Sequence, residues 1–130
     1  MPGPDIFAAL AALRDHLGAL PGVATSDIGL EANMTPDDYP MVRIVPSGLT
    51  NGPTTTGRTC SVLIYFGQPI HEFTGGLSAQ WQSLLGMEST LLGAMQSVPG
   101  IKGVRYLETV LDEDRNDAYK LLAIRAEVRA

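Results

Sequence analysis

The chain opens with apolar residues spaced as on one face of a helix. Steps of four and three alternate along Ile6, Leu10, Leu13, Leu17 and Leu20. Asp5 stands where a carboxylate caps a first helical turn, and Pro21 and Gly22 stop the periodic run. The pattern predicts a helix over residues 5–20, followed by a short strand within residues 23–30.

Two strand-like segments come next. In Tyr39–Val45, alternate residues face opposite sides: Met41, Arg43 and Val45 on one side, Val42 and Ile44 on the other. Pro46 lacks the N–H that a strand ladder needs, so we expect this strand to end there. Arg58–Gly67 is dense in β-branched and aromatic residues, which indicates a second strand. The two predict a hairpin whose flexible tip is the loop of residues 47–57, rich in Gly, Thr, Asn and Pro.

A second helix and a second hairpin complete the pattern. The helix is expected over Gly76–Val98, where the apolar stripe is Leu77, Trp81, Leu84, Leu85, Leu91, Leu92, Met95 and Val98. Strands are expected near Val104–Leu111 and Ala118–Val128, joined by the charged turn DEDRND. In the last strand, apolar residues face one side, namely Leu122, Ile124, Ala126 and Val128. This alternation is typical of a sheet with one buried face.

These elements predict a single α+β domain over residues 1–130. Its order is α-β-β-α-β-β, with an antiparallel or mixed sheet of about four to five strands packed against two main helices. The 130 residues, 45% of them hydrophobic and 18% charged, have the composition of one folded domain. The lone Cys60 excludes an internal disulfide. A net charge of −5 lacks the basic footprint of nucleic-acid binders, and no apolar run is long enough to cross a membrane.

Residues 52–59, GPTTTGRT, resemble the phosphate-loop pattern G-x-x-x-x-G-K-[ST]. Arg58 stands at the lysine position, and Pro53 removes one N–H from the cradle. A working loop is also followed by a helix, whose N-terminal N–H groups bind the phosphate. Here the sequence after Gly57 predicts a strand, so we interpret the segment as a polar hairpin tip.

Other candidate chemistry is sparse. Cys60 with His71 has the residue types of a nucleophile and its base, but Cys60 falls inside a predicted strand among apolar residues. His16 and His71 lie far apart, and no cluster has metal-ligand spacing. An acidic group is found at the last turn, namely Asp112, Glu113, Asp114 and Asp117, without the pattern of a calcium loop. We expect no catalytic residue, cofactor or metal site, and therefore no enzymatic activity.

Charge is unevenly distributed along the chain. Residues 46–101 contain only three of the charged residues, Arg58, Glu72 and Glu88. The predicted second helix has small uncharged polar residues outside its apolar stripe, Gln82 among them. Depletion of charge marks the core of protein interfaces, so the middle of the chain is expected to make subunit contacts. A helix that is simply poor in charge is the alternative.

The layout resembles the tail terminator, or tail-completion, proteins of long-tailed phages. The segments that carry the resemblance are DIFAALAALRDHLGAL, YPMVRIVPSG, RTCSVLIYFG, the 76–98 helix and YLETVLDEDRNDAYKLLAIRAEV. They cover most of the chain, and the resemblance lies in their order, size and texture; neighbouring neck proteins share much of it. It implies a structural virion protein at the head-proximal end of the tail, assembled in the host cytoplasm. The family has no catalytic residues to carry over.

The resemblance also implies partners. A ring, expected to be a hexamer, would cap the tail tube, stop its polymerisation and join the head through a head-completion or neck protein, with DNA passing through without specific binding. Expected interface residues are Thr54, Thr55, Thr56, Arg58, Glu72, Gln82 and Glu88. Arg58 and Glu72 are possible members of matching patches. A small intracellular α+β enzyme or ligand-binding domain is the alternative function.

Overall fold

The fold is a mixed five-stranded sheet with two helices. The computed structural model describes residues 5–29, 40–51, 58–69, 77–112 and 119–130. Its elements are α1 (Ile6–Gly18), β1 (Thr25–Ile28), β2 (Met41–Asn51), β3 (Arg58–Pro69), α2 (Leu77–Met95), β4 (Gly103–Asp112) and β5 (Tyr119–Arg129). The strand order in space is β1-β2-β3-β5-β4, with β1 parallel to β2 and every other pair antiparallel. The predicted α+β class, the two main helices and the short strand before residue 30 are confirmed.

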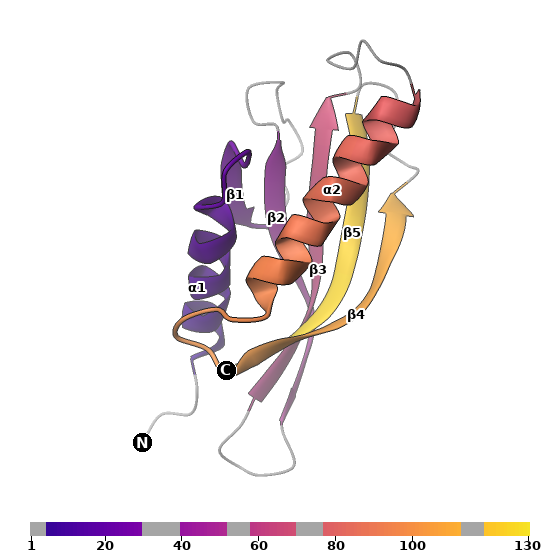
Figure 1. The fold of residues 1–130 in the computed structure, drawn as a ribbon. Helices are drawn as coiled ribbons and strands as arrows, with labels where there is room; N and C mark the ends of the chain where they lie inside the picture. The colour runs from indigo at the N-terminus through magenta and orange to yellow at the C-terminus, as the bar shows by residue number, and fades with distance from the viewer. Residues whose placement is uncertain (1–4, 30–39, 52–57, 70–76, 113–118) are drawn as a thin grey trace.

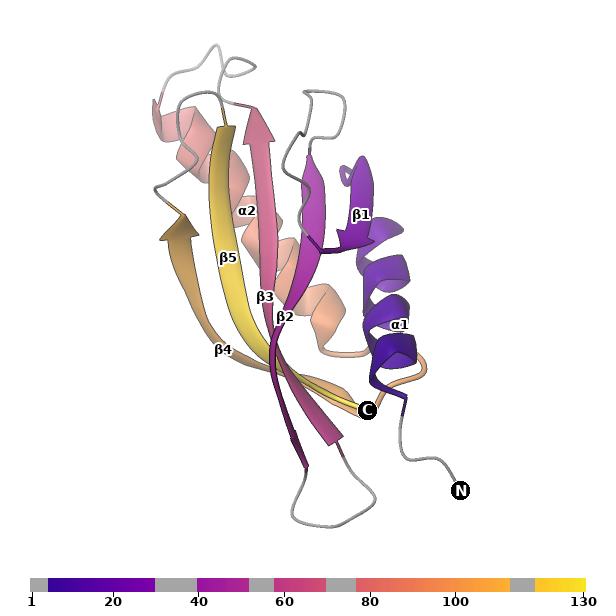
Figure 2. The ribbon, with the colours of Figure 1, turned by 180° about the vertical axis from the view of Figure 1, so that it is seen from behind.

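Both helices lie on one face of the sheet, α1 over the β1 and β2 side and α2 diagonally across β3 and β5 (Figures 1 and 2). Even-numbered residues of the two central strands point to this face and are buried: Cys60, Val62, Ile64 and Phe66 in β3, and Leu122, Ile124, Ala126 and Val128 in β5. Burying one large apolar side chain of this kind contributes about 1.5–3 kcal/mol. The opposite face, which includes Leu63, Arg125 and Glu127, has no described helix over it, and we call it the helix-free face.

The first helix forms as its sequence predicts. The carboxylate of Asp5 accepts a hydrogen bond from the backbone N–H of Ala8 at 3.1 Å, which caps the first turn. Leu10, Leu13 and Leu17 are buried against the sheet. The end of the helix lies very close to β1, because a Cβ on Gly18 would come within 2.9 Å of the Cβ of Ser26. Glycine at position 18 is therefore required by this packing.

The expected end of a strand at Pro46 is wrong. β2 continues to Asn51, and residues 47–51 of the predicted loop belong to it, whereas residues 52–57 fall outside the described residues. β1 pairs with β2 only over Met41–Ile44, so Pro46 faces no described strand on the outer side and its missing N–H breaks no ladder there. The pairing of β2 with β3 shifts register between Pro46 and Gly48, as at a β-bulge, where a proline is tolerated.

The second helix is shorter than predicted and rotated relative to its expected stripe. Leu84, Leu91 and Met95 are buried, but the side chain of Leu85 is 50% exposed. Leu85 lies about 100° around the helix from Leu84, which takes it off the buried face. Met87 packs against the core on the opposite flank, whereas Trp81 and Leu92, on the same side as Leu85, are partly buried as expected. The side chain of Leu77 is outside the described residues.

The closing hairpin is confirmed within one or two residues at each end. Its β4 strand contains a bulge that the sequence did not predict, between Tyr106 and Glu108. Asp112 ends β4, and the rest of the acidic group, within residues 113–118, lies outside the described residues. Arg43, on the helix-free face, is buried and donates a hydrogen bond from Nη1 to the carbonyl of Val42 at 2.8 Å.

Candidate subunit-contact surface

The segment that resembles a phosphate loop leads into a strand. Arg58 and Thr59 are the first residues of β3 and pair with Asn51 and Thr50 of β2. No helix N-terminus follows this segment, so the converging N–H groups of a phosphate loop are not supplied from that side. The interpretation of residues 58 and 59 as the start of a strand is confirmed, and the tip itself lies outside the described residues.

Cys60 has the surroundings of a structural residue. Its side chain is fully buried in the core, and this burial raises the pKa of the Cys60 thiol, while the nearby Arg58 guanidinium lowers it by less. A thiol held in its neutral form is a poor nucleophile. His71, its suggested base, lies outside the described residues.

His16 joins the two helices. Its Nε2 lies 3.0 Å from the carbonyl oxygen of Ala94, and since a carbonyl can only accept, the imidazole donates. The side chain of His16 therefore braces α1 against the end of α2. Among the described residues no group of three or more His, Cys, Asp or Glu side chains is placed to hold a metal ion.

The structure does not gather the predicted interface residues into one patch. Gln82 is exposed on α2, whereas Glu88, six residues further on, is only half exposed and turned toward the sheet side. Arg58 lies at the start of β3, and its Nε is buried without a hydrogen-bond partner in the part of the chain that the structure describes. Thr54, Thr55, Thr56 and Glu72 lie outside the described residues.

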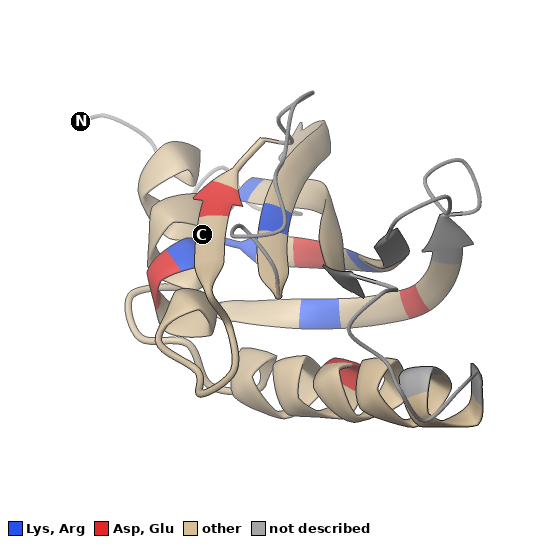
Figure 3. Ribbon diagram, turned by 90° about the horizontal axis from the view of Figure 1, so that it is seen from above, with Lys and Arg blue, Asp and Glu red and all other residues tan. Residues whose placement is uncertain are grey.

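A different grouping stands out on the outer face of α2, defined here by Gln82, Leu85, Gly86, Ser89 and Gly93. These residues are exposed and none is charged. In the view from above, α2 runs along the lower edge and carries one acidic band and no basic one (Figure 3). In the sequence of α2 this acidic residue is Glu88. A solvated helix face usually carries Lys, Glu or Arg, so this face has the composition of an interface core.

Two glycines on this face make no close packing contact with any described part of the chain. Gly86 is in the middle of α2 and Gly93 in its last turn, neither with a positive φ. A Cβ built on either would meet no atom within 4 Å. Glycine inside a helix costs up to about 1 kcal/mol relative to alanine. The two positions therefore leave room for another backbone to approach α2 closely.

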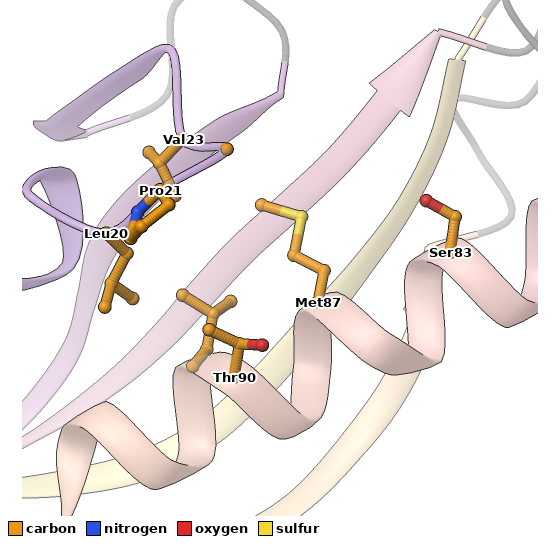
Figure 4. A pocket seen from close by; sticks show the side chains of 8 residues that line it. Leu20, Pro21, Val23, Ser83, Met87 and Thr90 are labelled. Carbon is orange, nitrogen blue, oxygen red and sulfur yellow. The ribbon is translucent and has the colours of Figure 1, made fainter.

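A pocket borders the same face. It has a volume of about 210 Å³ and lies between α2 and the turn that follows α1 (Figure 4). The turn contributes Leu20, Pro21 and Val23. The α2 side is lined by Ser83, Met87, Thr90 and Leu91. Its described lining residues are apolar or neutral, so the pocket suits an apolar side chain better than a charged ligand. Sequence reasoning missed it because Leu20 and Met87 meet only in the fold.

The pocket and the outer face of α2 form one continuous surface. At 100° per residue, Ser83 and Thr90 lie on the flank next to Gly86 and Gly93. A partner element lying along the two glycines could therefore place an apolar side chain in the pocket. We call this combined region the α2 surface; it consists of the outer face of α2 and the pocket residues Leu20, Pro21, Gly22, Val23, Ser83, Met87, Thr90 and Leu91.

A scan against protein-family models and a search of curated proteins gave no match to this chain. Among the described residues, neither α1 nor α2 has the length and apolar character needed to cross a membrane.

Proposed function

We propose that this chain is a structural subunit of a phage tail, the terminator that caps the tail tube as an oligomeric ring. The ring ends tail polymerisation and presents the surface that joins the head. Neighbouring copies contact one another through the α2 surface. A ring joins two different patches on each copy, so the α2 surface meets a second, different region of the next subunit.

The observation that carries assembly is the pair of glycines on an uncharged helix face. Gly86 and Gly93 destabilise α2 unless another backbone packs against them, and no described part of this chain does so. The exposed Leu85 beside them adds apolar area to the same surface. The particular assembly is supported by the resemblance in element order to tail terminators.

Two experiments test the proposal. Native mass spectrometry and negative-stain imaging of the purified protein are expected to show a closed ring, six subunits being the expected number. Added to the tail-tube protein of the same phage, the ring is expected to halt tube growth at substoichiometric amounts, because one cap blocks one tube end. The same amount of a ring-deficient variant should leave tube length unchanged.

A strictly monomeric protein that leaves tube growth unchanged would contradict the proposal. In that case the pocket between α1 and α2 becomes the first place to look for a small ligand. Its volume of about 210 Å³ and its neutral lining would then favour a small apolar molecule.

A further inference from the structure

The strand β4 is an open edge of the sheet. It pairs with β5 on one side, and no described strand lies on its other side. β4 starts near the lower end of α1 and then runs along the outer side of β5, away from α1 (Figure 1). Two adjacent side chains on it, Tyr106 and Leu107, are 45% and 47% exposed. A long edge strand with exposed apolar residues is a template for pairing with another strand.

A basic residue precedes Tyr106 and Leu107 in β4, and an acidic residue follows them. Arg105 precedes them and contacts Glu127 of β5, with 3.5 Å between Nη1 and Oε1. Glu108 follows them and contacts Arg125 of β5 at 3.2 Å. Both ion pairs lie on the helix-free face. The segment Arg-Tyr-Leu-Glu therefore has a basic end and an acidic end around an apolar centre.

The bulge in β4 puts both charges on the same face. In a regular strand, residues 105 and 108 would point to opposite sides, since they are three positions apart. The extra residue between Tyr106 and Glu108 reverses this alternation, so Arg105 and Glu108 both stand on the helix-free face. Residues paired across antiparallel strands must share a face. The bulge thus allows Arg105 of one strand to stand opposite Glu108 of an identical strand.

We propose that β4 pairs antiparallel with β4 of a second copy of this chain, with the two-fold axis at Tyr106 and the extra residue Leu107 left out of the ladder, as it is in the pairing with β5. Arg105 of each copy then stands opposite Glu108 of the other. The charges of the second copy extend the existing ion pairs into one row across four strands: Arg125 and Glu108 of one copy, then Arg105 and Glu127 of the second. Signs alternate along the whole row, and the two-fold axis produces the row twice.

This contact is separate from the proposed ring. The ring joins unlike patches through the α2 surface, whereas the β4 contact joins like edges about a two-fold axis. If both exist, two rings pack against each other and the subunit number is even. If only the β4 contact exists, the protein is a dimer. The two proposals can therefore fail independently.

The test uses two charge reversals, Arg105→Glu and Glu108→Arg. Each variant alone sets like charges opposite each other at both contacts and is expected to weaken the two-fold dimer about tenfold or more. In a mixture, the glutamate introduced at position 105 of one variant meets the arginine introduced at position 108 of the other. At the second contact, the unchanged Glu108 of the first variant meets the unchanged Arg105 of the second. Both contacts are then attractive, so the mixture is expected to recover the wild-type affinity.

Native mass spectrometry with one variant labelled with ¹⁵N gives the heterodimer its own mass. Both reversed side chains are exposed, 73% for Arg105 and 54% for Glu108, so the folded monomer should tolerate them. Each variant loses the same internal ion pair whether alone or mixed, so recovery on mixing cannot come from restoring internal structure. Arg129→Glu makes the same charge change on an exposed residue of β5 and is expected to leave the dimer intact.

Recovery in the mixture, with loss in each variant alone, supports the β4 contact. Wild-type protein without two-fold pairing overturns it, as does a mixture that stays as weak as the single variants. A ring of six subunits unaffected by either reversal would overturn the β4 contact and leave the ring proposal standing. A dimer that depends on these charges, in a protein that forms no rings, would support the β4 contact and overturn the ring proposal.

Discussion

The helices α1 and α2 lie on the same face of one sheet, and their inner sides are alike. Leu13 and Leu17 of α1 and Leu84 and Leu91 of α2 are fully buried in one core. Their outer sides differ: α1 carries the exposed ion pair of Arg14 and Asp15, whereas the outer side of α2 has no charge.

The glycines of the two helices differ in the same way. Gly18 of α1 is needed because Ser26 lies against it, and Gly86 of α2 has open space around it. Among the residues that the structure describes, therefore, packing requires glycine at position 18 but not at position 86. The difference is the one expected under the proposed function, in which α1 is complete within the subunit and α2 packs against a neighbour.

The largest loss of stability is expected from substitutions on the sheet-facing sides of α1 and α2, where the two helices should behave alike. Leu17→Ala and Leu91→Ala each remove a fully buried side chain and leave a cavity. Each is expected to lower the free energy of unfolding by about 2–5 kcal/mol. Urea denaturation measures this, under conditions that keep the protein monomeric. A small cost for Leu91→Ala alone would mean that α2 does not belong to the monomer core.

The second largest change in stability is expected at Gly18, and it should differ in sign from the change at Gly86. Gly18→Ala should destabilise the fold by about 1–3 kcal/mol, because the new methyl group would overlap the side chain of Ser26. The added methyl also competes with the hydrogen bond that Ser26 Oγ donates to the carbonyl of Arg14 at 2.9 Å. The thermal midpoint of the monomer reports the change. An unchanged midpoint would contradict the close packing of α1 on β1.

Gly86→Ala is expected to act in the opposite direction on the monomer. Its methyl group meets open space, so the substitution should stabilise α2 by up to about 1 kcal/mol. The same methyl group should weaken assembly, since it holds the neighbouring backbone away. Sedimentation velocity and urea denaturation on the same sample give both readouts. A variant that is more stable and assembles as well as the wild type would remove the reason proposed for Gly86.

The smallest effect is expected on the outer side of α1. Asp15→Asn breaks the contact with Arg14 Nε at 3.0 Å, but this pair is exposed and screened by solvent. The expected change in unfolding free energy is below about 0.5 kcal/mol, with no change in assembly. A clear loss of assembly would instead place α1 in a subunit contact.

Sequence patterns predicted the elements well and the surfaces only in part. The periodicity of Leu10, Leu13 and Leu17 was sufficient for α1, and the alternation of β5 was sufficient for its buried face. The strand through Pro46 was missed, because whether a proline is tolerated depends on whether a neighbouring strand is present on that side. A single sequence does not show where β1 stops pairing with β2.

The candidate surfaces could likewise be recognised only from the fold, because they depend on how the elements pack. The single charged residue of α2, Glu88, was visible in the sequence, but the open space around Gly86 and Gly93 was not. The exposure of Leu85 depends on how the helix is rotated against the sheet. The bulge after Tyr106 depends on the pairing of β4 with β5, and it alone places Arg105 and Glu108 on one face.

The most direct measurement of the central claim compares the oligomeric mass of two matched variants. Ser89→Glu places a charge on the exposed outer face of α2, and Ala8→Glu places the same charge on an exposed position of α1. Native mass spectrometry at equal concentrations is expected to show loss of the wild-type oligomer for Ser89→Glu alone, with unchanged monomer stability. A wild-type mass for both variants, or equal loss in both, would contradict the claim that α2 is the subunit-contact helix.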